Sequence, residues 1–403
     1  MNESDRKGKP GVLPISRRDL ASLLASLGAR TSGLVLLSSL GTLARSRMAA
    51  AAAGTINLCS WGGAYQFSQI EGYEKPFTKA HGIGFNNIEK SANGPALVSA
   101  QEESGNVTWD IVDMLQSPAF QLDSQGILQE IDFDKDLEPA PDGTPASQDF
   151  IPGSLSGDGK KGAYVSTISY STVFAYNVKA FPADHPPRTV QDVFDLKTFP
   201  GTRALEKIPA GNLEWALYAD GVAKDKIYEV LQTPAGVDRA FRKLDTIKRN
   251  VVWWSEGAEP PQMLAQKEAV IATAFNGRIF DAIASDNQPF AFIWDGGLYE
   301  WDGWVIPAGL SEDKLARAMK FLRFSTNTTS LVAQARYIAY SPARQSSFKL
   351  MQELTYYKNP KIRMWPYMPT NPPHLKLAIA KNVAFWSNYG PQLDQRFSSW
   401  LAA

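Results

Sequence analysis

The sequence predicts an α/β fold built on a sheet with parallel strands. Short apolar runs alternate with amphipathic stretches along most of the 403 residues, as expected where helices connect neighbouring strands. The composition agrees, because 44% hydrophobic and 20% charged residues suit a folded chain rather than a disordered one. A chain of this length can bury one large core or two of moderate size.

The first half of the chain shows the alternation most clearly. The turns that leave its first two strands begin at Trp61 and Gln116. Ligands of parallel α/β sheets bind at the carboxyl ends of strands, so these turns are the first places to expect a site. Strands are expected over residues 55–60, 110–115 and 163–176, and helices over 66–81 and 120–126.

The second half continues the pattern. Residues 134–162, rich in Pro, Gly, Asp and Ser, are predicted as a surface loop, and the Pro-rich segment 365–373 as a loop before a final helix. The β-rich stretch 163–176 is long enough to pass between two lobes. Helices are expected over 213–223, 226–231, 237–249, 315–324 and 331–335, and strands over 270–275 and 304–306.

Residues 1–53 have the order of an export signal: a basic start, an apolar stretch and a run of small residues. Arg17 and Arg18 before the apolar stretch favour the twin-arginine route. Arg30 and several Ser and Gly residues make this stretch a poor membrane-spanning helix. We therefore expect an exported protein that works in the periplasm.

Charge and cysteine content narrow the function. Residues 55–403 hold 33 basic and 38 acidic residues, which argues against a nucleic-acid partner. The single cysteine, Cys59, excludes an intramolecular disulfide and is predicted to be a small buried residue of the first strand. His81, His185 and His374 are scattered, so we expect neither a zinc site nor a cofactor.

An ordered series of short motifs runs through residues 55–345. The motifs are Cys-Ser-Trp-Gly-Gly-Ala-Tyr (59–65), Trp-Asp-Ile-Val (109–112), Gly-Ile-Leu-Gln-Glu-Ile-Asp (126–132), Gly-Asn-Leu-Glu-Trp-Ala-Leu (211–217), Trp-Trp-Ser-Glu-Gly-Ala-Glu-Pro-Pro-Gln (253–262), Ala-Phe-Asn-Gly-Arg-Ile (274–279), Trp-Val-Ile-Pro-Ala-Gly (304–309) and Tyr-Ser-Pro-Ala-Arg (340–344). Together they resemble the spermidine/putrescine-type periplasmic binding proteins of ABC importers.

The resemblance implies a type II periplasmic-binding-protein fold, in which two discontinuous lobes are joined by crossover strands and enclose a ligand cleft. Lobe 1 is then expected over 55–165 and 277–305, and lobe 2 over 166–276 and 306–403 with the C-terminal helices. It further implies a monomer that binds a small amine such as putrescine or spermidine, or a related nitrogenous solute. The monomer would deliver it to an inner-membrane permease, with no catalytic activity.

Binding sites of this family hold an amine between aromatic faces and carboxylates. Asp302 is the leading candidate for an ammonium partner, with Glu300 in reserve. Several candidates have structural alternatives: Trp61 and Tyr340 could belong to the core, and Gln116 and Ser117 could cap a helix. The ligand-binding candidates are Trp61, Gly62, Gly63, Gln116, Ser117, Trp254, Phe275, Asn276, Arg278, Tyr299, Trp301, Asp302 and Tyr340.

Two departures from the polyamine pattern matter. The segment Ile208-Pro209-Ala210-Gly211 lacks the acids that polyamine binders of this family carry there. Arg278 lies near a position where some relatives have an acid. A guanidinium in the cleft would repel a polyamine and attract a carboxylate, which favours an anionic or zwitterionic solute such as an opine or amino-acid conjugate. Pairing of Arg278 with a neighbouring acid is the structural alternative.

Two further alternatives come from other classes. Tyr356 and Tyr357 could hold a ferric ion, since distant relatives coordinate iron through paired tyrosines. A carbohydrate hydrolase would need paired carboxylates in an aromatic cleft, for which Glu256, Glu259, Glu300 and Asp302 are the candidates. No Gly-x-Ser-x-Gly, His-Glu-x-x-His or phosphate-loop motif supports an enzyme.

Overall fold

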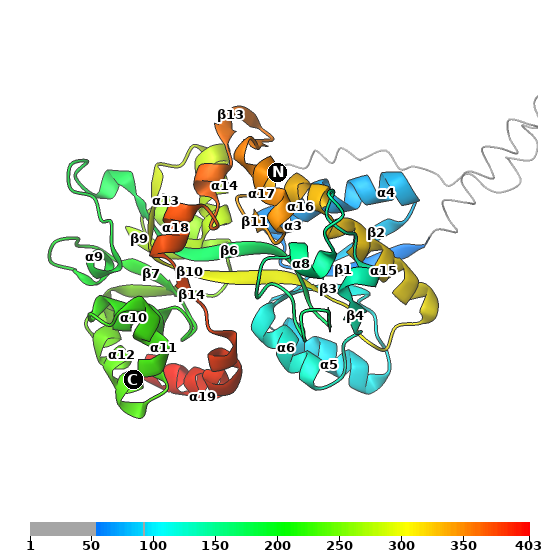
Figure 1. Cartoon of the computed structure of the whole chain (residues 1–403). Helices are drawn as coiled ribbons and strands as arrows, with labels where there is room; N and C mark the ends of the chain where they lie inside the picture. Colours follow the sequence, from blue (N-terminus) through cyan, green and yellow to red (C-terminus); the bar gives the residue numbers. More distant parts are fainter. Residues whose placement is uncertain (1–53, 92) are drawn as a thin grey trace, which may run out of the picture. The chain divides into compact units, whose positions relative to one another are not determined.

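The computed structural model describes residues 54–403 except residue 92 (Figure 1). The predicted export signal, residues 1–53, lies outside the described residues. Within the described part, no helix combines the length and the apolar content needed to cross a bilayer.

One mixed sheet organises the described chain. Its main path runs β2-β1-β3-β10-β6-β9-β7-β8, with β11 paired to β6 and β14 to β10. The strands near both ends of this path are parallel, as predicted, whereas β10 and β6 run antiparallel to each other and to their outer neighbours β3 and β9. The strands are β1 (Thr55–Ser60), β2 (Gly84–Glu89), β3 (Ile111–Leu115), β4 (Ile131–Asp132), β5 (Lys161–Gly162), β6 (Val165–Asn177), β7 (Arg203–Glu206), β8 (Val251–Trp254), β9 (Ile271–Phe275), β10 (Phe290–Val305), β11 (Ser341–Pro342), β12 (Thr355–Tyr356), β13 (Asn359–Arg363) and β14 (Ile379–Ala380).

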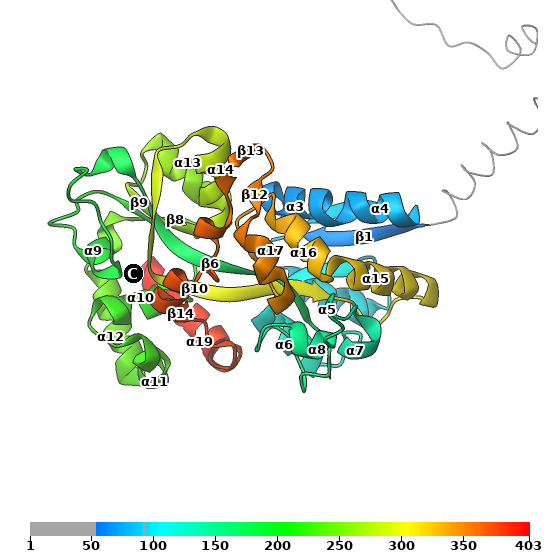
Figure 2. The same ribbon diagram turned by 45° about the horizontal axis from the view of Figure 1, so that its top comes forward.

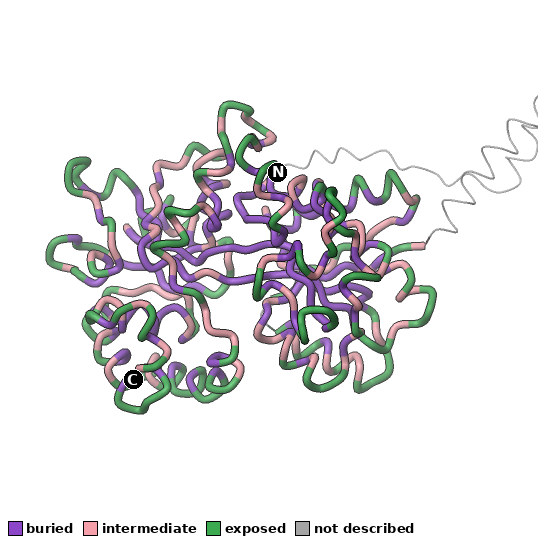
Figure 3. Tube along the Cα trace, viewed as in Figure 1, coloured by how far each residue is buried: buried purple, intermediate pink, exposed green. Residues whose placement is uncertain are grey.

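The strands β6 and β10 lie side by side across the middle of the sheet (Figures 1 and 2). All 13 residues of β6 are buried, and the burial continues along much of β10 (Figure 3). Val, Thr, Tyr and Phe in β6 suit a strand that is covered on both faces. These two strands connect the parallel set β2-β1-β3 to the parallel set β9-β7-β8.

The helices surround the sheet, and their starts follow local capping signals. Thr233 accepts a hydrogen bond from the Gly236 N–H, and Pro234 occupies the first turn, so α12 begins before the predicted residue 237. The helices are α3 (Gly63–Gln69), α4 (Lys75–His81), α5 (Gly94–Ser104), α6 (Gln116–Ser124), α7 (Phe133–Asp136), α8 (Ala146–Asp149), α9 (Val190–Phe194), α10 (Asn212–Ala219), α11 (Ile227–Leu231), α12 (Pro234–Asp245), α13 (Glu259–Gln266), α14 (Asn276–Asp286), α15 (Glu312–Ser325), α16 (Thr328–Ala335), α17 (Phe348–Gln352), α18 (Pro372–Leu377) and α19 (Val383–Ala402).

Three elements, β2, β7 and α14, were not predicted from the sequence. Strand β2 carries the polar sequence Gly-Phe-Asn-Asn-Ile-Glu and is only half-buried, because it forms the edge of the sheet. Helix α14 follows β9 without an intervening loop, and β7 has only four residues. The predicted helix over 66–81 exists but is interrupted by a π-helical turn, Ile70–Glu74, between α3 and α4.

Side chains of the C-terminal part of the chain pack in two different hydrophobic cores. Phe321 of α15 and Leu331 of α16 pack in the same cluster as Ile56 of β1, whereas Phe385 and Phe397 of α19 belong to a cluster around α10 and α12. The apolar faces of α15 and α16 are thus buried against the set β2-β1-β3. Residues 306–403 therefore contribute to both ends of the sheet.

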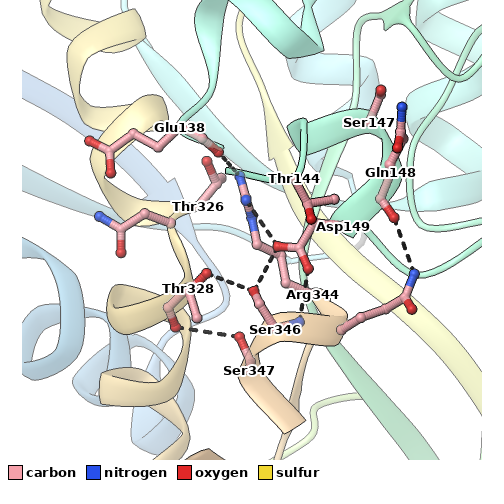
Figure 4. A network of polar contacts seen from close by, with 12 residues as sticks. Glu138, Thr144, Ser147, Gln148, Asp149, Thr326, Thr328, Arg344, Ser346 and Ser347 are labelled. Atoms are coloured by element: carbon pink, nitrogen blue, oxygen red, sulfur yellow. Dashed lines mark hydrogen bonds and ion pairs between the residues drawn. The ribbon is translucent and has the colours of Figure 1, made fainter. Parts of the chain in front are cut away.

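A buried ion pair holds the segment before β6 against the last quarter of the chain (Figure 4). The Arg344 Nη1 atom lies 3.1 Å from Asp149 Oδ2, and the two side chains are 0% and 4% exposed. Arg344 Nη2 donates to the Glu138 carbonyl at 2.8 Å, and the Ser346 N–H and hydroxyl donate to the Asp149 carboxylate at 2.8 and 2.7 Å. The two charges are therefore paired and also hydrogen-bonded, which buried charges require.

Replacing Asp149 with Ala should destabilise the protein by about 3–5 kcal/mol, because it leaves the Arg344 guanidinium buried without its counter-ion. Urea unfolding followed by circular dichroism measures this loss. Glu229→Ala is the control, since it removes an acid from an exposed pair with Lys226 and should shift the midpoint far less. Equal midpoints for the two variants would contradict the role given to the Arg344–Asp149 pair.

Candidate functional site

A cavity of about 460 Å³ opens where the two parallel sets of strands end. Trp61 directly follows β1, Leu115 ends β3, Glu206 ends β7 and Phe275 ends β9. The cavity therefore lies at the carboxyl ends of parallel strands, where α/β sheets bind ligands. Its lining residues are Trp61, Tyr65, Lys90, Ser91, Pro95, Met114, Leu115, Pro118, Ile168, Tyr170, Glu206, Lys207, Ile208, Ser255, Glu256, Gly257, Phe275, Arg278, Asp302 and Tyr340.

Five of the predicted ligand-binding residues line this cavity: Trp61, Phe275, Arg278, Asp302 and Tyr340. They come from both parallel sets and from β10, so the fold brings together residues that are far apart in the sequence. Tyr340 also packs in an aromatic cluster, with its ring centroid 5.5 Å from that of Tyr65. It therefore lies both at the cavity wall and in the core.

Gly62 and Gly63 follow the cavity residue Trp61, and both contact Arg278: Gly63 leaves space for its guanidinium, and Gly62 accepts a hydrogen bond from it. Both have positive φ angles, 66° and 57°, which favour glycine. A Cβ atom on Gly63 would lie only 2.4 Å from Arg278 Nη1, and Arg278 Nη2 donates to the Gly62 carbonyl at 3.4 Å. The turn after β1 thus positions the guanidinium of Arg278.

Trp254, a predicted ligand contact, does not line the cavity. It is fully buried, and its Nε1–H donates to Thr273 Oγ1 at 3.1 Å. Its neighbour Trp253 points to the other face of β8 and packs against Phe397 and Trp400. Both faces of β8 are covered by protein here, so neither indole is left for a ligand.

Asn276, Gln116 and Ser117 bond to other parts of the chain instead of lining the cavity. The Asn276 amide donates to the carbonyls of Ala339 and Tyr367 and accepts from the Ser171 N–H. The Gln116 amide donates to the Gly153 carbonyl at 2.6 Å. The Ser117 hydroxyl lies 3.1 Å from that of Ser387, which joins α6 to α19.

Side-chain alternation along β10 separates the remaining candidates. Asp302 faces the cavity, so Trp301 points to the opposite face of the sheet, where it is buried in the core with Tyr299 packed edge-on against it. Glu300 has the same parity as Asp302. It lines a smaller adjoining pocket of about 60 Å³, where it pairs with Lys381 and accepts a hydrogen bond from Tyr170.

The iron alternative places its tyrosine pair outside the cavity, whereas Glu256 and Asp302 of the hydrolase alternative line the cavity and Glu300 lines the smaller pocket. Tyr356 is buried, and its hydroxyl bonds to Asp281 and Ser285, outside the cavity. Among the described residues, no group of three or more His, Cys, Asp or Glu is arranged to hold a metal ion.

Sequence reasoning missed several charged cavity residues, Lys90 above all. It follows the unpredicted strand β2, and its ammonium lies 2.9 Å from the centroid of the Trp61 ring. Lys207 and Glu206 were missed as wall residues because β7 was not predicted. With Arg278, Glu256 and Asp302, they give the wall three basic and three acidic side chains.

Burial controls the titration of the acids. Burial and the neighbouring Asp113 hold the pKa of Asp302 well above its usual range, and burial likewise raises the pKa of Asp113. Burial raises the pKa of Glu206 to about 8, with Lys381 opposing the shift and Glu300 adding to it. The deep acids therefore carry less negative charge near neutral pH than their number suggests.

The sheet order and the placement of the cavity define an α/β periplasmic-binding-protein fold, and solved structures share it over most of the chain. The PBP MotA from A. tumefaciens, solved in complex with glucopine, is 27% identical with a TM-score of 0.74, over 86% of this chain and 99% of that one. An ABC transporter substrate-binding protein from Bradyrhizobium japonicum is 31% identical with a TM-score of 0.72, over 86% and 99% of the two chains.

Residues 73–370 match the bacterial extracellular solute-binding protein family, to which this chain belongs. A gamma-aminobutyric acid-binding protein from Pseudomonas aeruginosa is 34% identical over 365 residues, which cover 90% of this chain and 96% of the relative. The protein is thus a solute-binding component of an ABC transporter and not an enzyme.

The expected likeness to polyamine binders holds for the fold only. A spermidine/putrescine substrate-binding protein from Streptococcus pneumoniae is 15% identical with a TM-score of 0.63. Two of the more similar relatives named above bear the names of other solutes, glucopine and gamma-aminobutyric acid.

Glu206 predicts a pH dependence of stability. Its pKa is raised on folding from about 4.5 to about 8, so folding favours the protonated acid, and stability should fall as pH rises between these values. Glu206→Gln cannot ionise. The free energy of unfolding of the variant relative to the wild type should therefore increase by about 1–3 kcal/mol from pH 5.5 to 8.5. Urea titrations at both pH values measure this increase; a difference independent of pH would contradict the raised pKa of Glu206.

Proposed function

We propose that this protein captures a small zwitterionic solute, an ω-amino acid or an opine-like amino-acid conjugate, for import. The observation that carries the proposal is the Arg278 guanidinium at the cavity wall. Its Nε atom is buried without a hydrogen-bond partner, and no carboxylate pairs with it within the described residues. A guanidinium with free donors binds a carboxylate through charge-assisted, often bidentate hydrogen bonds.

The rest of the wall supports a ligand that also carries a positive charge. Glu206 and Glu256 lie at or just beyond the ends of β7 and β8 and present carboxyl groups to the cavity. The rings of Trp61, Tyr170 and Phe275 cover the apolar part of a ligand. A cavity of this size accommodates solutes larger than a four-carbon amino acid. The names of the relatives, a gamma-aminobutyric acid-binding protein and a glucopine complex, agree with this class.

A polyamine is the second candidate, and the wall argues against it. A diamine would have to approach Lys90, Lys207 and Arg278, all in one cavity. Repulsion between like charges in a partly desolvated site costs more than in water. The aromatic faces alone, at roughly 0.5–2 kcal/mol per cation–π contact, do not compensate for this repulsion.

The two ends of the sheet provide the mechanism that we propose for transport. Residues on both parallel sets line the cavity, and β6 and β10 connect the sets, so a bend in these strands would close the lobes over the solute. The closed form would then engage the permease in the inner membrane. Periplasmic delivery through the twin-arginine signal and a monomeric state belong to the same proposal.

A ligand panel tests the proposal directly. Gamma-aminobutyric acid, glucopine, putrescine, spermidine and glucose are added to the purified mature protein, and the melting temperature is recorded. A bound ligand stabilises the fold by RT ln(1 + [L]/Kd), so a zwitterion should raise the melting temperature and the polyamines should not. Stabilisation by putrescine alone would contradict the proposed solute class.

Arg278→Ala should weaken binding of the stabilising zwitterion about 10- to 100-fold, because hydrogen bonds to a charged group contribute about 1.5–3 kcal/mol. Isothermal titration calorimetry measures the dissociation constant. Arg239→Ala is the control, because it removes an arginine whose partner is the exposed Asp220, outside the cavity. An Arg278→Ala protein that binds the zwitterion as tightly as the Arg239→Ala protein would remove Arg278 from the site.

A further inference from the structure

The Lys90 side chain occupies a position that its surroundings are shaped to hold. Its backbone N–H donates to the Ser60 carbonyl at 2.9 Å, which fixes it beside the end of β1. Its aliphatic chain runs over Gly94, where a Cβ atom would lie 2.5 Å from the Lys90 Cδ atom. The missing side chain of Gly94 therefore gives Lys90 its path to the cavity.

The ammonium of Lys90 is 2.9 Å from the centre of the Trp61 ring, and the residue is only 7% exposed. Within the part of the chain that the structure describes, its Nζ atom has no hydrogen-bond partner. A buried ammonium without such partners is costly, and the remaining compensation comes from the indole face and nearby acids. Burial lowers the pKa of Lys90, while Asp302 and Asp113 raise it, with a resulting pKa of about 8.

Two acids lie near enough to Lys90 for their charges to act on its ammonium. Asp302 lines the cavity together with Lys90, and the Asp113 carboxylate accepts hydrogen bonds from Ser60 and Gln69 through Oδ2, while Oδ1 has none from the described residues. An indole face with two carboxyl groups is the set of partners that would hold a ligand ammonium. Here a side chain of the protein fills that set.

We propose that Lys90 is a specificity-determining residue that occupies the ammonium position on Trp61 and so excludes cationic amines from the cavity. This inference rests on the proposed function insofar as the same cavity is the solute site. It assigns the acids Asp113 and Asp302 to Lys90 rather than to the ligand. The ammonium of a zwitterion is then left with Glu206 and Glu256 on the opposite wall, while Arg278 takes the carboxylate.

Lys90→Met tests the inference, with putrescine and n-butylamine as probes and 1-butanol as the neutral analogue. Methionine keeps most of the aliphatic volume but vacates the cation position. The dissociation constants of both amines, measured by calorimetry, should fall at least tenfold relative to the wild type, and 1-butanol should not gain affinity. Lys90→Arg keeps a cation over Trp61 and should exclude the amines as the wild type does.

Lys207→Met is the matched control, because it removes one positive charge from the same cavity at an exposed position away from Trp61. An equal gain in amine affinity in Lys90→Met and Lys207→Met would show an effect of net charge alone and would overturn the inference. No gain in a folded Lys90→Met protein would also overturn it.

Gly94→Ala provides a second route if Lys90→Met does not fold, as judged by its thermal transition. The added methyl group displaces the Lys90 chain from its path and should likewise raise amine affinity, whereas unchanged affinity would count against the inference. The result is separable from the proposed function. Failure of every zwitterion to bind the wild type would contradict the proposed function, while the change in amine affinity on mutation would still decide the role of Lys90.

Discussion

The antiparallel pairing of β6 with β10 is the contact on which the rest of the structure depends. These two strands are hydrogen-bonded to each other along most of their length. Each also pairs with a strand of one parallel set, β10 with β3 and β6 with β9. Because both are buried along most of their length, their register is fixed by burial on both faces. That register places Asp302 and Tyr170 at the cavity and Trp301 in the core.

The charged side chains at the cavity wall have fewer partners than a buried charge elsewhere in the fold. Arg344, which does not line the cavity, has a carboxylate partner and further hydrogen bonds, as expected for a buried charge that serves structure. Among the described residues, Arg278 has one hydrogen bond, to the Gly62 carbonyl, and no carboxylate ion pair, and the Lys90 Nζ atom has no hydrogen-bond partner. The contrast is the basis on which we propose solute-related roles for Arg278 and Lys90 and a structural role for Arg344.

Much of the fold could be predicted from the sequence, because apolar runs such as 55–60 and 270–275 are central strands with strong patterns. The likeness to a binding-protein family also located Trp61, Phe275, Arg278 and Asp302 at one cavity. Lys90 could not be found this way, since it follows an edge strand whose polar sequence has no clear period. Trp254 shows the converse problem: an indole at the end of a strand is equally suited to core and cleft, and only its packing with Leu264 of α13 and Ile279 of α14 decides.

The Arg344–Asp149 pair has a consequence for the order in which the chain acquires its structure. Its partners are 195 residues apart, and the chain has one cysteine, so no internal disulfide can join these segments. The segment around Asp149 therefore cannot form its ion pair with Arg344 until most of the polypeptide has left the ribosome. Contacts of such long sequence separation slow folding. A nascent chain therefore has time to meet chaperones or export machinery before the Asp149 and Arg344 segments pack together.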